Sequence, residues 1–209
     1  MSTSVRPKGV IKMISPYHPL LYYINQDQDI DIQKLKASLD AYGGVDQSDP
    51  CGSSLLMYAA SAGNDTFVRT LVELGADVNQ RDDDNDTPLL CASYPGHTST
   101  VQLLLDCGAD INAKDRNEMT SLMLAAWKNR IVCAQILLDR GASAGERCVE
   151  GRNARDYATG AYLPLLVRVR LVSLDKTGLL NLSAVQKRFS VTDQADREAI
   201  LDLLERHQP

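Results

Sequence analysis

A segment of 33 residues recurs three times without gaps, and this periodicity constrains the fold more than any other feature of the sequence. The three copies span residues 49–81, 82–114 and 115–147. Self-similarity at a fixed spacing of about 20 to 50 residues is the signature of arrays in which each unit packs mainly against its neighbours. The sequence therefore predicts a solenoid of stacked units and not a single closed core.

Each copy contains the signals of two short helices joined by a turn. The first helix follows a hydroxyl residue, whose oxygen can accept a hydrogen bond from a first-turn amide; these residues are Ser54, Thr87 and Thr120. Apolar residues then recur at helical spacing in two stretches, and small residues in the first stretch let the second helix approach closely. A glycine falls where a left-handed residue ends the second helix, at positions 75, 108 and 141. The predicted unit is helix, turn, helix and hairpin.

Two motifs in the second copy resemble a known family. Residues 87–92 read TPLLCA and residues 108–112 read GADIN, which is similar to the T-P-L-H-x-A start and the G-A-D-x-N end of the ankyrin repeat. The resemblance implies an all-α ankyrin-repeat solenoid with β-hairpin-like tips. It extends over residues 18–170 and is strong over 49–145. One departure is Leu90, which stands where the family usually has a histidine that ties neighbouring loops together.

Fainter copies flank the full repeats and extend the array. Residues 18–48 resemble an N-terminal capping repeat, in which Leu35 and Leu39 fall in register with the second helix of the next copy. Residues 148–170 resemble a C-terminal capping repeat that opens at Asn153. Its second helix would come from Leu165, Leu166 and Val169. Terminal repeats are expected to be atypical because a neighbour buries only one of their faces.

The two ends of the chain do not follow the period. Residues 1–17 are expected to form an N-terminal arm, and residues 171–209 a short C-terminal helical extension. Apolar spacing in the extension favours helices at 179–189 and 192–204, whereas alternation of apolar residues and arginine over 167–172 leaves a strand open there. The extension is expected either to pack against the last repeat or to dock a partner.

No group of residues in the sequence has the pattern of a catalytic or metal site. The three histidines are scattered, no nucleophile has a nearby base, and the glycines recur once per repeat instead of forming a phosphate-binding loop. A calcium loop over residues 173–184 is rejected because Ala184 stands where a glutamate is needed. The five cysteines form an odd set without a C-x-x-C pair, which favours reduced structural thiols. We expect no enzyme activity, no cofactor and no metal.

The charge and hydropathy of the sequence limit the class of partner and the cellular compartment that we expect. The formal net charge of −5 and the pI near 5.2 argue against nucleic acid as the main partner. No apolar run reaches the roughly 18 residues of a membrane helix and no secretory signal is present, so we expect no membrane partner and a cytoplasmic location. The nucleus is an alternative, and an organelle is another because residues 1–26 contain basic but no acidic residues, as transit peptides do.

The resemblance implies that the chain binds another protein through a concave surface of hairpin tips and inner helices. In ankyrin-like modules the contact positions are at the tips, just before the helix cap and just after the paired alanines. On this sequence they are Ser61, Arg81, Asp83, Asp84, Asp86, Tyr94, Lys114, Arg116, Asn117, Met119, Trp127 and Lys128. The protein would act as an adaptor, a scaffold or a subunit of a larger assembly. The alternatives are an inhibitor or regulatory subunit of another enzyme, and an enzyme with a site in the C-terminal extension.

Tyr94 and Trp127 lie one period apart, so they should project from the same place on adjacent inner helices, about 8 to 10 Å apart. Aromatic side chains dominate interface hot spots, so the pair is predicted to be an anchor for the partner. The alternative is that Trp127 packs beneath the next hairpin, because a lone tryptophan is often largely buried. The acidic run between Asp82 and Asp86 is expected to be a solvated hairpin tip.

Overall fold

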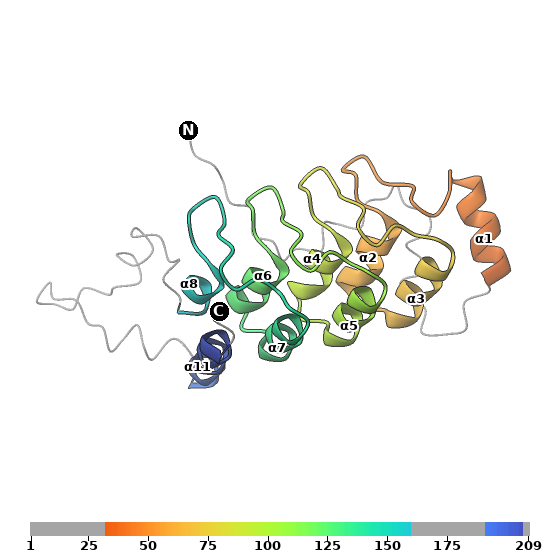
Figure 1. Ribbon diagram of the computed structural model, residues 1–209. Coiled ribbons are helices and arrows are strands. Elements are labelled where there is room, and N and C mark those ends of the chain that lie inside the picture. Colours follow the sequence, from red (N-terminus) through yellow and green to blue (C-terminus); the bar gives the residue numbers. More distant parts are fainter. Residues whose placement is uncertain (1–31, 160–190, 207–209) are drawn as a thin grey trace, which may run out of the picture.

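The computed structural model describes residues 32–159 and 191–206, and it shows helix pairs stacked side by side in a row (Figure 1). The inner helices are α2 (Leu55–Ala62), α4 (Pro88–Ser93), α6 (Ser121–Trp127) and α8 (Ala154–Ala158). The outer helices are α3 (Asp65–Glu73), α5 (Thr98–Asp106), α7 (Ile131–Asp139) and α11 (Val191–Arg206), and α1 (Ile32–Ala41) lies at the N-terminal end of the row (Figure 1). Hairpin loops project on one side of the row, beyond the inner helices (Figure 1). The predicted all-α solenoid is confirmed.

The predicted helix caps are present at each full repeat. The side-chain oxygens of Ser54, Thr87 and Thr120 accept hydrogen bonds from backbone amides three residues later, at 3.3 to 3.4 Å. Pro88 occupies the first turn of α4, where its missing amide costs nothing. Gly75 follows α3 with a φ of 94°, a left-handed conformation that glycine adopts without strain. Local signals therefore set where these helices begin and end.

The core is one continuous layer between the inner and outer helices. Leu71, Leu104 and Leu137, the equivalent leucines of the three outer helices, are fully buried. The small residues Ala59, Ala92 and Ala125 are also fully buried and let the outer helices lie close against the inner ones. Leu35 and Leu39 of α1 join the same cluster, as their register predicted. Each unit therefore buries its apolar face against the next one along the row.

A repeated aspartate shapes the hairpin loops. One side-chain oxygen of Asp49, Asp82 or Asp115 accepts two backbone hydrogen bonds, from the amides two and four residues later, at 2.7 to 3.0 Å. Antiparallel bridges join Ser48 to Ser54 and Lys114 to Thr120 across two of these loops. The loops are hairpin-like, as predicted, and each bridge is confined to a single residue pair.

The fourth hairpin has Cys148 where the other three have the aspartate. Its backbone makes the same turn, because the Cys148 amide donates to the Arg152 carbonyl at 2.9 Å and the Gly151 amide donates to the Cys148 carbonyl at 2.8 Å. The thiol, a weak acceptor, lies 3.4 Å from the Tyr157 hydroxyl. The aspartate of the first repeat accepts a bond from the equivalent tyrosine, since the Tyr58 hydroxyl donates to Asp49 at 2.7 Å.

We expect the substitution Cys148→Asp to raise the free energy of unfolding by about 1 kcal/mol, because a carboxylate there would accept the two turn amides and the tyrosine hydroxyl. Urea denaturation followed by circular dichroism measures the change. Cys148→Ala is the control and should not stabilise the protein. A loss of stability in Cys148→Asp would show that burying the charge outweighs the new hydrogen bonds.

Asp and Asn side chains in the loops that follow the helices α1, α3 and α5 link consecutive repeats. Asp46, Asn79 and Asn112 each accept a hydrogen bond from the backbone amide 31 residues later, at 2.7 to 2.9 Å. Asn79 also donates to the Gly108 carbonyl at 3.1 Å. We call these three residues the Asx ladder. It fixes the spacing between neighbouring units through contacts with main-chain atoms.

Helix α11 completes the C-terminal end of the row. It packs against α8 and α7, in the position that an outer helix takes beside its inner helix and the preceding outer helix (Figure 1). Ile200 and Leu204 are buried in this contact, and Arg155 of α8 pairs with Glu205 at 2.5 Å. The expected extension helix is thus present, and it begins one residue before the expected start. The described part of the extension packs against the last repeat.

Several sequence predictions lie outside the described residues. They are the N-terminal arm, the first helix of the N-terminal cap, the second helix predicted from Leu165, Leu166 and Val169, the strand at 167–172 and the helix at 179–189. The predicted start of the C-terminal cap is confirmed, because Asn153 caps α8 and forms a reciprocal pair of hydrogen bonds with Asp156. Among the helices that the structure describes, none combines the length and apolar character needed to span a bilayer.

Candidate functional site

Two predicted aromatic residues meet at the ends of adjacent inner helices. Tyr94 directly follows α4 and Trp127 is the last residue of α6, and their ring centroids lie 5.8 Å apart in an edge-to-face arrangement. Such a geometry is favourable for aromatic pairs. Both side chains are partly exposed because the inner helices end at this point. The equal spacing of the repeats therefore brings the pair together.

A third ring, which the sequence prediction missed, extends this group. Tyr157 of α8 lies 6.3 Å from Trp127 between ring centroids, and it is only 7% exposed. It does not belong to the same column of the repeat as Tyr94 and Trp127, so the period gave no signal for it. Its column contains Tyr58 in the first repeat. Trp127 therefore packs on one side against α8 while part of its surface stays open.

Lys128 covers both rings of the predicted pair. Its ammonium nitrogen lies 4.4 Å from the centroid of Tyr94 and 4.9 Å from that of Trp127. A cation within about 6 Å of a ring face is attracted by the ring quadrupole. Lys128 forms no ion pair within the residues 32–159 and 191–206. We call Tyr94, Trp127 and Lys128 the aromatic anchor.

Met119 is placed differently from the other predicted contact residues. Its side chain is only 7% exposed, and its sulfur lies 3.9 Å from the Tyr157 hydroxyl. The position before the helix cap is therefore directed inward in the third repeat. Met119 contacts the Tyr157 side chain and offers little surface to a partner.

The predicted tip residues Arg81, Lys114 and Arg116 bind groups on the next or preceding hairpin. Arg116 pairs with Asp84 at 2.5 Å, and Lys114 pairs with Glu146 at 2.8 Å. Arg81 donates to the Lys114 carbonyl at 2.9 Å. Surface pairs of this kind are worth little individually, but a series of them restricts the motion of neighbouring loops. Much of the charge at the tips is therefore paired between neighbouring hairpins.

The remaining predicted residues lie at separate places along the same surface. The Asn117 carbonyl accepts a hydrogen bond from the next hairpin, and Asp83 is exposed on the second tip. Asp86 is partly buried. Ser61 lies at the end of α2, where its carbonyl accepts a hydrogen bond from His97 Nε2 at 3.1 Å. The structure thus brings Tyr94, Trp127 and Lys128 together, whereas the tip residues and Ser61 contact neighbouring hairpins and turns instead.

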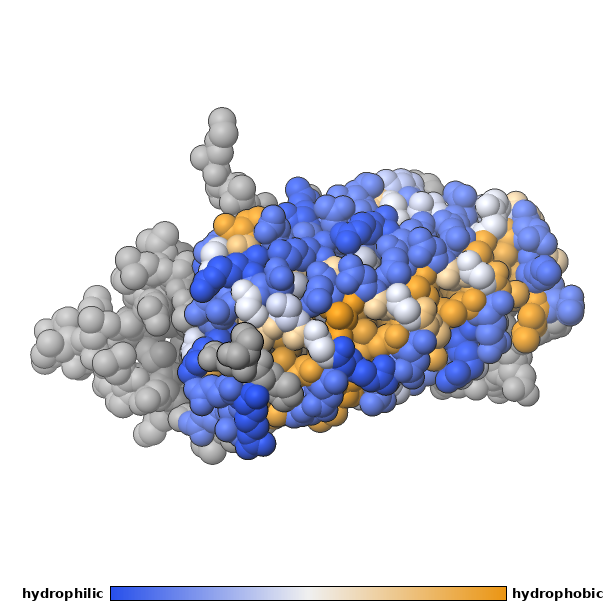
Figure 2. Space-filling model, viewed as in Figure 1, coloured by the Kyte–Doolittle hydropathy of each residue, from blue (hydrophilic) through white to orange (hydrophobic). Residues whose placement is uncertain are grey.

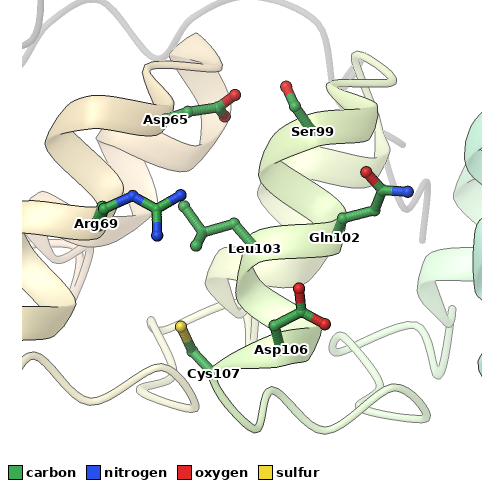
Figure 3. A pocket seen from close by; sticks show the side chains of 7 residues that line it. All are labelled: Asp65, Arg69, Ser99, Gln102, Leu103, Asp106 and Cys107. Atoms are coloured by element: carbon green, nitrogen blue, oxygen red, sulfur yellow. The ribbon is translucent and has the colours of Figure 1, made fainter.

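The opposite, outer face has a shallow pocket of about 350 Å³ between α3 and α5 (Figure 3). Its polar groups are largely engaged by neighbouring helices: Asp65 accepts from Thr100 at 2.5 Å, and Asp106 pairs with Arg140 at 2.7 Å. Nothing in this pocket resembles a nucleophile with its base.

Figure 2 shows that the hairpin tips at the top of the view are mostly hydrophilic and that apolar patches lie below them.

Burial favours the neutral forms of two ionisable groups, Tyr58 and Cys133. Burial and the hydrogen bond to Asp49 raise the pKa of the Tyr58 hydroxyl well above its usual value. Burial raises the pKa of the Cys133 thiol to about 11. All five thiols are free, and the described residues contain no group of three or more His, Cys, Asp or Glu that could hold a metal ion. These groups are arranged for packing.

The raised pKa of Cys133 predicts an order of reactivity among the thiols. A thiolate is the reactive form, so a thiol with a pKa of about 11 stays protonated and inert from pH 7 to about pH 9. Iodoacetamide at pH 8 should modify the exposed Cys51 first and Cys133 only after unfolding, as peptide mass spectrometry would show. Equal modification of both thiols in native protein would contradict the burial of Cys133.

Comparison with known proteins agrees with this architecture. A family model for ankyrin repeats, in three copies, matches residues 20–115 and residues 56–148. Together the two matches cover the row from α1 to the hairpin before α8. No curated protein matches the chain.

Proposed function

Because the chain belongs to the ankyrin repeat family, we propose that it is a non-catalytic adaptor, scaffold or assembly subunit that binds its partner at the aromatic anchor. Ankyrin repeats are protein–protein interaction modules. The observation that carries the proposal is the partly exposed pair Tyr94 and Trp127, which sits on the inner-helix side under Lys128. Large aromatic residues in such places supply much of the binding energy of interfaces.

The rigidity of the surrounding surface supports the proposal. The tip pairs and the Asx ladder tie neighbouring repeats together on the hairpin side of the row, where the outer helices end and the next inner helices begin. A surface that is already ordered loses less conformational freedom when a partner binds, so more of the contact energy appears as affinity. The helices that carry the anchor therefore belong to repeats whose relative positions are already fixed.

We expect Trp127→Ala to weaken capture of the native partner at least 10-fold, which corresponds to about 1.4 kcal/mol or more of binding free energy. The measurement is affinity capture from native lysate with the full chain and quantification of the bound proteins by mass spectrometry. Removing Trp127 also removes its contacts with Tyr94 and Tyr157, so urea denaturation must show that the variant is folded under the capture conditions.

The matched control is Ile136→Ala in α7, which truncates a partly buried apolar side chain of the same repeat on the outer side. It should lower stability while leaving capture unchanged. If Ile136→Ala and Trp127→Ala reduce capture equally, the loss follows stability and the anchor is not the contact surface.

A further inference from the structure

The turn between α6 and α7 is the only one of three equivalent turns in the described chain that carries two permanent positive charges. It contains Lys128 and Arg130, whereas the equivalent turns are SAGN at residues 61–64 and YPGH at residues 94–97. Neither Lys128 nor Arg130 has an ion-pair partner in the described residues. Lys128 is part of the aromatic anchor, and the Arg130 side chain lies against Gly96, two residues after Tyr94.

The other cations near this end of the row already have acceptors. Lys114 pairs with Glu146, Arg116 with Asp84 and Arg152 with Glu150, while Arg147 donates to the Gly151 carbonyl. An incoming anion would have to displace those partners, and it would displace none at Lys128. The lysine can keep its contact with the ring faces while its remaining N–H groups bind an acceptor, because an ammonium has three donors.

We propose that the anchor receives an acidic–apolar segment of a partner protein. Its carboxylate pairs with Lys128 and Arg130, and its neighbouring large apolar side chain packs on the open part of Trp127. The inference rests on the proposed function and adds the chemistry of the partner. A basic segment is disfavoured because it would bring like charges together where the rings lower the local polarity. The open apolar surface of Trp127 distinguishes the site from one that binds only the phosphate groups of a nucleic acid.

The only tryptophan of the chain lies in the anchor, so its fluorescence reports on this site alone. Three synthetic peptide pools of about 12 residues serve as probes: each has a central Leu or Phe, flanked by Glu in one pool, Lys in the second and Ser in the third. The full chain is titrated with each pool. The Glu pool should change the emission at concentrations at least 10-fold lower than the Lys pool, and the difference should shrink as the salt concentration is raised.

Reversing the charge of the turn should reverse the preference. The variant Lys128→Glu/Arg130→Glu is expected to respond to the Lys pool at lower concentration than to the Glu pool. Lys36→Glu on α1 is a control because it changes an exposed lysine far along the row. It should keep the preference of the native chain. Circular dichroism confirms that both variants are folded.

Several outcomes overturn the proposal. They are an equal response to the three pools, no response to any of them, an unchanged preference in the double variant, and a response to a random single-stranded oligonucleotide that exceeds the response to the Glu pool. Self-association of the native chain that the double variant abolishes would assign the anchor to a second copy. The proposed function fails on a different result, which is that Trp127→Ala leaves partner capture intact. If Trp127→Ala abolishes capture but the native chain responds equally to the three peptide pools, only the acidic–apolar chemistry of the partner is refuted.

Discussion

Replacing Leu104 by alanine is expected to lower the free energy of unfolding by about 3 kcal/mol, within the range of about 2 to 5 kcal/mol seen for buried leucines. Leu104 is fully buried in the middle outer helix, so the truncation leaves a cavity at the centre of the row. Both adjacent repeats pack against this unit, and the outer helices α3, α5 and α7 contact one another in sequence. Urea denaturation followed by circular dichroism measures the loss.

Val132→Ala on α7 is the control for this experiment. Val132 is 62% exposed, so its truncation should change stability by no more than about 0.5 kcal/mol. A loss below about 1 kcal/mol for Leu104→Ala would mean that the stack relaxes into the space left by the side chain, contrary to a close-packed layer between the helices.

Replacing Ile200 by aspartate is expected to detach α11 from the row. Ile200 is fully buried against the last repeat, and a carboxylate there would lose its hydration without a partner, which costs several kcal/mol. Undocking also removes the burial of Leu204, worth about 1.5 to 3 kcal/mol. Amide hydrogen exchange in α8 should then speed up by about 100-fold or more.

The stack predicts where this effect stops. Each unit contacts only its neighbours, so exchange in α2 and α3 should remain unchanged in Ile200→Asp. Asp202→Ala, at an exposed position on the same helix, should leave the exchange of α8 as it is. Uniform acceleration from α2 to α8 would show that the row unfolds as one cooperative unit.

The sequence was sufficient for the features that depend on local rules repeated at each unit. The hydroxyl caps, the first-turn Pro88 and the left-handed Gly75 each act within a few residues of themselves, so their pattern can be read along the chain. The 33-residue period then places equivalent residues beside one another in space. For the same reason the spacing alone predicts the pairing of Tyr94 with Trp127.

Features that depend on contacts between residues far apart in the sequence could not be predicted from the repeat pattern. Residues 160–190 separate α8 from α11, and no periodicity shows that a helix so far along the chain takes the outer position beside α8. Tyr157 joins Trp127 from another column of the repeat. The inward direction of Met119 and the placement of Lys128 over two rings depend on side-chain conformation, which composition does not specify.

The Asx ladder has a consequence for how this molecule can change over time. Because Asp46, Asn79 and Asn112 bond to main-chain amides, the pitch of the row does not depend on which side chains occupy the anchor. Mutation can therefore exchange the recognition residues one by one, and selection can retarget the protein to a new partner, while the scaffold that presents them keeps its shape.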